Sequence, residues 1–258
     1  MRKFYHFLVK IGINPVAFFS FLIGLPAFIR DYRTFKKQLG KDPGFPFGSL
    51  YPILSDKRTE NGKIRGAYFQ QDLLVARKLF RKNPDKHIDV GSRIDGFVAH
   101  VAVFREIEVF DVRPQTDKIT NVTLRQVDFM NLPDEMVNYC DSVSSLHAIE
   151  HFGLGRYGDP IDAYGHVKGI GNISRVLKSG GTFYFSVPIG KQRVEFNAHR
   201  IFDVSYLLGL LKPKFDIVSF SYIDDSFDLH EDVSLEDEMI KRNYGCNYGC
   251  GIFELLKK

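Results

Sequence analysis

Short apolar runs alternate with amphipathic stretches from residue 87 to the end of the sequence. The runs are rich in β-branched and aromatic residues, which predicts strands. The predicted strands are His87–Val90, Val109–Val112, Leu124–Val127, Ser142–Leu146, Thr182–Val187, Phe215–Ile223 and Gly251–Leu256. The stretch Gly165–Leu177 predicts a helix that is closed by Lys178-Ser179-Gly180-Gly181. Strands that alternate with helices indicate an α/β fold with a mostly parallel sheet, where ligands bind beyond the carboxyl ends of the strands.

The first forty residues follow a different pattern. Residues 11–29 contain no charged side chain, and from Leu25 onward apolar residues recur at helical spacing among basic ones. The apolar positions are Leu25, Phe28, Ile29, Tyr32, Phe35 and Leu39, and the basic positions are Arg30, Arg33, Lys36 and Lys37. An apolar stripe beside basic residues suits an anionic membrane surface. A helix packed on the main domain explains the same pattern, so both alternatives stay open.

Two further interpretations of residues 11–29 are less well supported. A secretory signal has a basic start and an apolar stretch, which are present, but the small residues of a cleavage site are missing. A transmembrane helix needs about 20 apolar residues, and this run is interrupted by Asn14, Pro15 and Pro26. The membrane alternative is therefore peripheral contact through residues 11–39.

The pattern divides the chain into three parts. Residues 1–40 are the amphipathic segment, and residues 41–84 are a glycine- and proline-rich connector followed by a helix over residues 68–82. Residues 85–258 carry the alternating strands and helices and are predicted to form one domain.

Charge and cysteine content narrow the setting. The 35 Lys and Arg residues exceed the 31 Asp and Glu residues by four, but residues 1–40 alone contribute +6, so the remainder sums to −2. A folded domain that is slightly acidic argues against a nucleic-acid partner. Three cysteines cannot all pair, which favours a reducing compartment. We expect a cytoplasmic protein, at the inner face of the cytoplasmic membrane if the first segment contacts lipid.

A glycine-rich turn follows the first predicted strand. The residues from Asp89 to Gly96 (DVGSRIDG) form a D-x-G-x(4)-G pattern at a strand-to-helix junction. Glycines there allow a ligand to approach the backbone, and the helix N-terminus favours anionic groups. A phosphate-binding P-loop is excluded because Gly96 is not followed by Lys. A dinucleotide G-x-G-x-x-G fingerprint is excluded because position 93 is Arg.

Carboxylates end the next two predicted strands. Asp111 is 22 residues after Asp89, an offset at which a carboxylate can accept both ribose hydroxyls of a nucleoside. Asp128 can accept from an adenine amino group while Phe129 packs on the ring. Strand-end aspartates also serve as turn and cap residues, but the ordered set of three predicts a nucleoside site.

At these positions the chain resembles the class I S-adenosylmethionine-dependent methyltransferases. The turn, the two acids and the passage from Ile173 to Thr182 (ISRVLKSGGT) carry the resemblance, which covers about residues 85–256. It implies a doubly wound, seven-stranded Rossmann-like sheet with an N-terminal helical extension, and S-adenosylmethionine (SAM) as cofactor. It implies as cofactor-binding residues Asp89, Gly91, Ser92, Gly96, Asp111, Val112, Asp128 and Phe129. Arg93 replaces the second glycine of the usual turn, which predicts crowding at the methionine end and leaves loss of SAM binding open.

Three stretches resemble a narrower, bacterial-type family of uncharacterised methyltransferase-like proteins. They are residues 145–159, 185–190 and 196–200. That family is associated with surface polysaccharide gene clusters, which implies a glycan or a nucleotide-sugar as substrate.

The fourth predicted strand runs into His147-Ala148-Ile149-Glu150-His151, an H-x-x-E-H pattern. The spacing matches a class of zinc sites, and on a helix both histidines would share a face with Glu150 beside them. Its place at a strand end beside a nucleoside site favours acid–base catalysis, so we predict His147, Glu150 and His151 as catalytic and no metal. A purely structural role is the remaining alternative.

The loop over residues 152–166 is polar and glycine-rich, as substrate loops often are. We expect substrate contacts there and in residues 196–200, from Arg156, Tyr157, Asp159, Asn197, His199 and Arg200. The leading hypothesis is O-methylation of a sugar in a surface polysaccharide or its activated precursor. The alternatives are a catalytically degenerate module that binds a nucleotide-linked glycan or a protein partner, and an NAD-dependent enzyme acting on nucleotide sugars.

Overall fold

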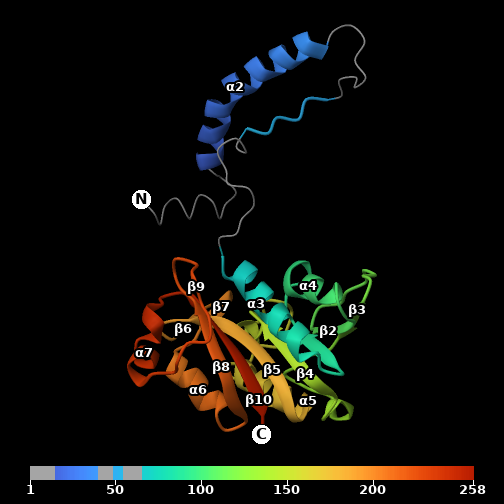
Figure 1. Ribbon diagram of the computed structural model, residues 1–258, viewed down its shortest axis with the longest axis vertical. Helices are drawn as coiled ribbons and strands as arrows, with labels where there is room; N and C mark the ends of the chain where they lie inside the picture. The colour runs from blue at the N-terminus through green and yellow to red at the C-terminus, as the bar shows by residue number, and fades with distance from the viewer. Residues whose placement is uncertain (1–14, 40–48, 55–65) are drawn as a thin grey trace. The chain divides into compact units, whose positions relative to one another are not determined.

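The computed structural model describes residues 15–39, 49–54 and 66–258. The chain forms two compact units, Met1–Lys63 and Ile64–Lys258. In the described part of the first unit, helix α2 (Pro15–Leu39) begins ten residues before the Leu25 stripe and continues through Pro26 (Figure 1). Within the described residues, no helix has the length and apolarity needed to cross a bilayer. Residues 11–14 and most of the predicted connector lie outside the described residues.

The second unit is built on an eight-stranded sheet with the order β3-β2-β1-β4-β5-β10-β8-β9 (Figure 1). Its strands are β1 (His87–Val90), β2 (Ile107–Asp111), β3 (Val122–Gln126), β4 (Cys140–Leu146), β5 (Leu177–Ile189), β8 (Phe215–Ile223), β9 (Leu229–His230) and β10 (Gly249–Lys257). Strands β1 to β5 run parallel, and β10 is antiparallel to both of its neighbours. The mostly parallel α/β sheet is confirmed, and its seven predicted strands are extended by the two-residue strand β9.

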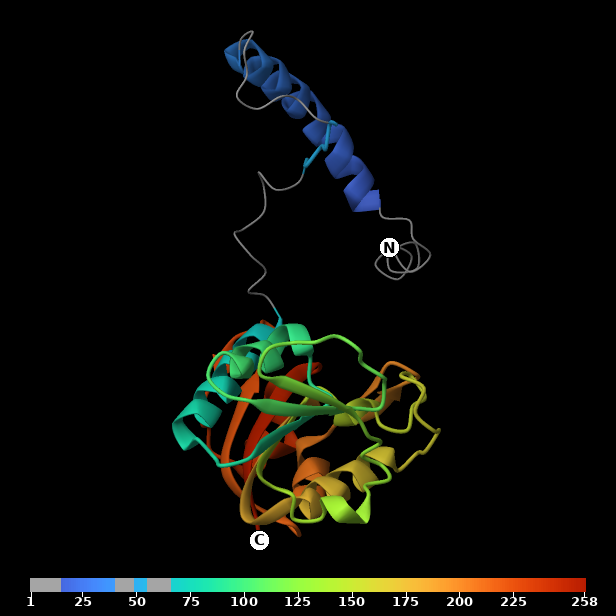
Figure 2. The same cartoon turned by 90° about the vertical axis from the view of Figure 1, so that its right-hand side faces the viewer.

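Helices cover both faces of this sheet, as Figure 2 shows. The helices are α3 (Ala67–Lys82), α4 (Ala99–Ala102), α5 (Gly165–Val176), α6 (Val204–Leu211) and α7 (Asp237–Lys241). A short antiparallel pair, β6 (Arg193–Glu195) and β7 (His199–Ile201), forms a separate sheet. The sequence pattern assigned α3 to the connector, whereas in the structure it belongs to the second unit because Leu74, Val75 and Leu79 are buried with sheet residues.

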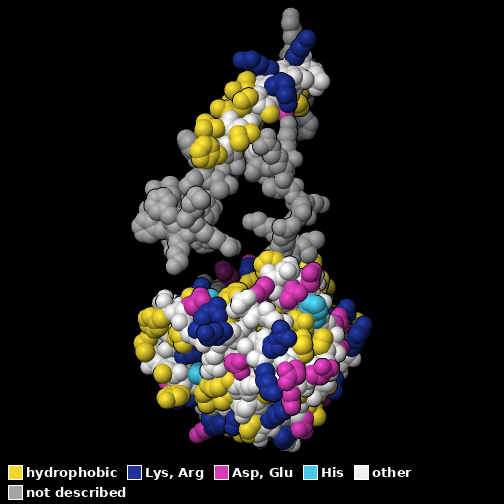
Figure 3. Space-filling view, turned by 90° about the vertical axis from the view of Figure 1, so that its left-hand side faces the viewer, with side chains coloured by type: hydrophobic (Ala, Val, Ile, Leu, Met, Phe, Trp, Pro, Cys, Tyr) yellow, Lys and Arg dark blue, Asp and Glu magenta, His cyan; other side chains and the backbone are white. Residues whose placement is uncertain are grey.

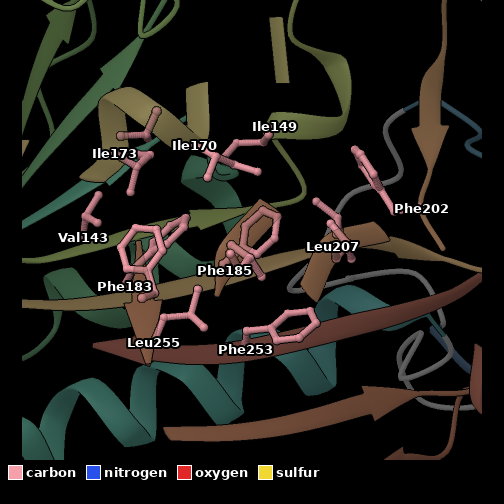
Figure 4. Close-up of a cluster of buried hydrophobic side chains, with 14 of the residues drawn as sticks. Val143, Ile149, Ile170, Ile173, Phe183, Phe185, Phe202, Leu207, Phe253 and Leu255 are labelled. Atoms are coloured by element: carbon pink, nitrogen blue, oxygen red, sulfur yellow. The ribbon is translucent and has the colours of Figure 1, made fainter. Parts of the chain in front are cut away.

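Alternation along the central strands produces two apolar layers. Phe183 and Phe185 of β5 lie with α5 and α6, whereas Tyr184 between them lies with α3. Phe253 and Ile252 of β10 divide between the same two layers. Figure 4 shows the first layer, where the β5 and β10 side chains meet those of α5 and α6. Burial on both faces explains the nearly continuous apolar sequence of these strands.

Candidate functional site

A cavity of about 860 Å³ lies where β1, β2, β3 and β4 end. It is lined by thirteen of the predicted site residues: Gly91, Ser92, Asp111, Val112, Asp128, Phe129, His147, Glu150, His151, Arg156, Tyr157, Asp159 and His199. Four predicted residues lie outside its lining: Asp89, Gly96, Asn197 and Arg200. The expectation that a site lies beyond the carboxyl ends of the strands therefore identified residues of one cavity that are up to 108 positions apart in sequence, from Gly91 to His199.

Gly91 begins the turn after β1 with a backbone that only glycine adopts easily. Its φ is +73°, and a Cβ placed there would lie 2.9 Å from the Cβ of Ala148. Its N–H donates to Phe110 O at 2.9 Å, which fixes the turn against β2. The result is bare backbone at the cavity wall, where a ligand can approach closely.

Asp89 holds this turn from below. Its carboxylate is fully buried and accepts hydrogen bonds from Ser92 N at 2.9 Å, Ser92 Oγ at 2.6 Å and Ser144 Oγ at 2.5 Å. Burial raises the pKa of Asp89 to about 6, against the opposing effect of these hydrogen bonds. Asp89 thus shapes the turn and does not itself face the cavity.

The other two unusual positions of the turn face α3. Gly96 leaves room for Asp72 of α3, whose Oδ2 would lie 2.5 Å from an added Cβ. Arg93 has an extended backbone, and its half-exposed guanidinium pairs with Asp95 at 2.7 Å and lies 5.1 Å from the centre of the Tyr68 ring. Arg93 lines the cavity, and its guanidinium is paired with Asp95, which belongs to the same lining.

Asp111 at the end of β2 is already engaged by Arg113. Its Oδ1 accepts from Arg113 N at 2.8 Å and Nε at 2.9 Å, and its Oδ2 accepts from Arg113 Nη2 at 2.6 Å. A carboxylate has about four acceptor positions, so only one remains for a ribose diol that brings two donors. At least one guanidinium bond must open when a ribose binds here.

Asp128 and Phe129 after β3 are held by local contacts. Asp128 accepts from Met130 N and Asn131 Nδ2, both at 2.8 Å. The Phe129 ring is buried beside Phe110, with ring centres 5.8 Å apart. Phe129 therefore forms part of the cavity floor from within the apolar layer instead of standing free beside a ligand ring.

The H-x-x-E-H pattern does not form the expected α-helix. His147 has a left-handed backbone with φ of +51°, and only Ile149–His151 forms a single 3-10 turn. The Nδ1 atom of His147 lies 2.8 Å from Glu150 Oε1, and the Nε2 atom of His151 lies 3.7 Å from the same oxygen. Both histidines thus flank one buried carboxylate, as expected, but a left-handed residue and a 3-10 turn bring them there in place of an α-helix. Among the described residues, no group of three or more His, Cys, Asp or Glu side chains is arranged to hold a metal.

The two histidines differ in charge. Burial opposes protonation of His147, but the Cys250 sulfur and the Glu150 carboxylate outweigh it and hold the His147 pKa well above its usual value. Burial would raise the Glu150 pKa, but His147 lowers it below its usual value. His147 and Glu150 therefore form an ion pair at neutral pH.

His151 is the neutral member of the cluster. Burial lowers its pKa, and the nearby Glu150 charge reverses this only in part. Its Nδ1 lies 2.7 Å from Ala198 O, which can only accept, so Nδ1 carries the proton and Nε2 carries the lone pair. His151 consequently has the protonation state and tautomer of a general base.

Tyr157, in the loop over residues 152–166, contacts both His151 and Arg113 in the cavity. Its ring meets His151 edge-on at 5.3 Å, and the Arg113 guanidinium lies 4.4 Å from its centre. Asp159 organises the loop by accepting from the backbone N–H groups of Gly153, Gly155 and Tyr157. Arg156 donates to Ala198 O at 2.9 Å, next to the His151 contact.

Arg200 is a correction to the predicted substrate contacts. It is buried, and its guanidinium donates to the carbonyl oxygens of Glu150, Phe152, Asp162 and Ala163 at 2.6–3.4 Å. The Arg200 guanidinium thus donates to carbonyl groups both at the 3-10 turn and at the far end of the loop over residues 152–166. Arg200 therefore holds the loop and the 3-10 turn together. Asn197 is exposed outside the cavity lining.

We expect Arg200→Met to lower the free energy of unfolding by about 2–4 kcal/mol, because one buried and three part-buried carbonyl groups lose their donor. Chemical denaturation monitored by circular dichroism measures the loss. Arg193→Met, which removes a more exposed arginine of the β6–β7 pair, should change stability by less than about 0.5 kcal/mol. Equal losses in the two variants would contradict the role assigned to Arg200.

Among the cavity residues that were not predicted from the sequence, three bring a polar or aromatic side chain beside the predicted ones: Tyr68, Arg113 and Tyr248. Tyr68 comes from α3, before the first strand, and its ring lies 4.9 Å from that of His147. Tyr248 lies in the turn before β10, and its ring lies 5.3 Å from that of His199. Only Arg113 follows a strand end, so the rule that found Asp111 could have found it.

The strand order and the cavity at the carboxyl strand ends define a class I methyltransferase fold, which solved structures share. One is the 1,6-didemethyltoxoflavin-N1-methyltransferase of Burkholderia thailandensis, solved with bound 1,6-didemethyltoxoflavin and S-adenosylhomocysteine. The TM-score is 0.54 and the sequence identity 13%, and the match covers 76% of this chain and 80% of that chain. Another is the N-methyltransferase NodS of Bradyrhizobium japonicum in complex with S-adenosylhomocysteine. Its TM-score is 0.50 and its sequence identity 11%, and the match covers 73% of this chain and 85% of that chain. A third is the [4+2]-cyclase SpnF, with a TM-score of 0.51 and a sequence identity of 18%. The match covers 77% of this chain and 85% of that chain.

The chain itself belongs to the family described as Caenorhabditis protein of unknown function, DUF268, whose model matches residues 102–246. The comparison with curated proteins gave no match. The matched region includes β2 to β8 and the whole H-x-x-E-H turn. The family match therefore includes most of the residues that line the cavity, but the family's description assigns no activity.

Proposed function

We propose that this protein is a SAM-dependent methyltransferase that acts on a hydroxyl group. The observation that carries the proposal is His151, a neutral histidine with its lone pair on Nε2, in the same cavity as the Gly91 turn and Asp111. Two of the fold's solved relatives hold S-adenosylhomocysteine, which supports this choice of cofactor.

The residues around Gly91 fit such a cofactor. The bare backbone of the turn gives close access, Asp111 provides a carboxylate for ribose hydroxyls, and Asp128 with Phe129 forms the wall beyond them. SAM supplies an electrophilic methyl group when bound. The volume of the cavity leaves room for an acceptor on the side of His147 and His151, which is also where the substrate loop lies.

His151 performs the proton transfer in this proposal. Its Nε2 would take the proton of the acceptor hydroxyl while that oxygen receives the methyl group that bound SAM would supply, with S-adenosylhomocysteine as the leaving group. Glu150, 3.7 Å away, stabilises the resulting imidazolium charge. His147 is paired with the same carboxylate and acts as a positioning residue. Orientation of the two reactants supplies much of the remaining acceleration.

A sugar hydroxyl of a glycan or of its activated precursor is the acceptor we propose. The rings of Tyr68, Tyr157 and Tyr248 line this part of the cavity and offer apolar faces with polar edges, which suits a ring that is apolar on its faces and carries hydroxyls at its rim. Arg156 adds a cation for the phosphate of an activated precursor.

Titration calorimetry with S-adenosylhomocysteine, NAD and nucleotide sugars, followed by methyl transfer from labelled SAM to a panel of sugars, amines and phenols, tests the proposal. Binding of S-adenosylhomocysteine with transfer to a sugar hydroxyl is expected. Binding of NAD alone, or transfer only to amines, would overturn it.

A non-catalytic module is the second candidate, and the Arg113–Asp111 pair is the observation that favours it. With three of about four acceptor positions occupied, Arg113 competes directly with a nucleoside. Weak or absent binding of S-adenosylhomocysteine, without turnover on any acceptor, would support this candidate.

The competition itself gives a prediction. Arg113→Met should tighten S-adenosylhomocysteine binding by about tenfold, because a charge-assisted pair no longer has to open. Arg156→Met removes another cavity arginine, which does not touch Asp111, and should leave this affinity within about twofold. Calorimetric dissociation constants decide the matter, and a weakened Arg113→Met complex would mean that Arg113 contacts the nucleoside itself.

A further inference from the structure

We propose that the described part of the first unit inserts into one leaflet of an anionic membrane. The amino-terminal half of α2 and the segment 49–54 enter the acyl region, and the basic end of α2 stays at the lipid headgroups. This inference does not rest on the proposed methyl transfer.

The amino-terminal half of α2 exposes large apolar side chains. Phe21, Leu22 and Ile23 are consecutive, so they point in different directions around the helix, and their exposed fractions are 46–55%. Among the α2 residues whose side chains the structure describes, none is buried. A helix with one apolar stripe needs only a protein groove, whereas apolar exposure around the helix suits a surrounding apolar medium.

The segment 49–54 enlarges this apolar surface. Gly24 of α2 lies against Leu54, whose Cβ would be 2.7 Å from a Cβ added to the glycine. Leu50, Tyr51 and Ile53 of the segment have exposed fractions of 53–82%. Gly24 thus allows a second apolar strip to join the helix from a position some 30 residues later in the sequence. The apolar surface therefore consists of two chain segments, only one of which the sequence pattern revealed.

Length and charge select a bilayer surface as the partner. The uncharged run Pro15–Ile29 is about 22 Å long in a helix, which is too short for a hydrocarbon core of about 30 Å but enough to enter one leaflet. Four cations (Arg30, Arg33, Lys36 and Lys37) and one acid follow it within residues 30–37. Figure 3 shows this separation, with apolar side chains along one part of α2 and basic ones toward its end. Anionic headgroups complement the net charge of +3.

Flotation of the full chain with lipid vesicles tests the proposal. Binding should be at least tenfold stronger to vesicles of phosphatidylcholine with phosphatidylglycerol than to phosphatidylcholine alone, and high salt should reduce the difference. Leu22→Glu with Ile23→Glu should lower binding to the anionic vesicles at least tenfold. Lys36→Glu with Lys37→Glu should remove most of the preference for anionic lipid. Val103→Glu, at an 84% exposed apolar position of the second unit, is the matched control and should bind as the parent chain does.

The absence of tryptophan from the sequence allows a readout that does not depend on disruptive variants. Ile53→Trp should show blue-shifted emission with anionic vesicles and quenching by brominated acyl chains. No binding to either vesicle, unchanged binding of the Leu22 and Ile23 variant, or a tryptophan that stays exposed to water would each overturn the proposal. A chain that avoids vesicles and sediments as a dimer that the same variant dissociates would assign the surface to a second copy instead.

Discussion

His151→Asn should lower kcat by roughly 10²–10⁴-fold, the usual contribution of a positioned general base. The asparagine amide can still donate to Ala198 O, which His151 Nδ1 contacts at 2.7 Å, but it offers no lone pair for the acceptor proton. Binding of S-adenosylhomocysteine should stay within about twofold, because His151 acts on the acceptor. Single-turnover transfer of labelled methyl measures the effect. An unchanged rate would remove His151 from the mechanism.

The pH dependence gives the same residue an independent test. In the proposed mechanism the neutral form of His151 is the active one, and burial lowers the His151 pKa, so the acid limb of kcat should lie below pH 6.5. Glu150 partly raises that pKa, so Glu150→Gln should move the limb to still lower pH. His151→Asn should flatten this limb. A limb at pH 7 or above would point to His147, whose pKa is raised, as the titrating group.

Asp111→Asn should weaken S-adenosylhomocysteine binding by about 10–100-fold, since a charged acceptor of hydroxyl hydrogen bonds contributes about 1.5–3 kcal/mol. The loss should be larger in the Arg113→Met background, where Asp111 is no longer engaged by the guanidinium. Asp117→Asn removes another carboxylate of the cavity lining and serves as the control, with little change expected. Calorimetry measures all four variants. Equal affinities for the parent chain and Asp111→Asn would reject Asp111 as the ribose acceptor.

The fold was largely predictable because its strands have strong local signals. Phe215–Ile223 was predicted to the residue, and the carboxyl strand ends placed Asp111 and His147 in one cavity. The ends of β5 were harder. Its strand begins at Leu177 and includes Gly180 and Gly181, which the pattern assigned to the turn after the helix. A register shift against β4 near Cys140 accompanies this early start, and such a shift is not visible in the apolar pattern.

The roles of individual site residues were less predictable, because they depend on pairing across the fold. Arg200 resembles a substrate contact in sequence, yet carbonyl groups 37–50 residues away use its donors. The helical spacing of His147 and His151 suggested an α-helix, but the left-handed backbone at His147 starts a different turn. The conclusion that the histidines share Glu150 survives, since a sharp turn can bring close in space the same residues that a helix would.

The Arg200 clamp has a consequence for acceptor recognition. Ordering a flexible loop around a ligand costs about 1–2 kcal/mol of backbone entropy for each residue. Here folding has already fixed the loop at both ends, through the carbonyl groups of Phe152 and Ala163, and Asp159 fixes its middle. Under the proposed function, an acceptor would meet a wall that is already formed, which favours a narrow range of acceptor shapes and a small entropic penalty on binding.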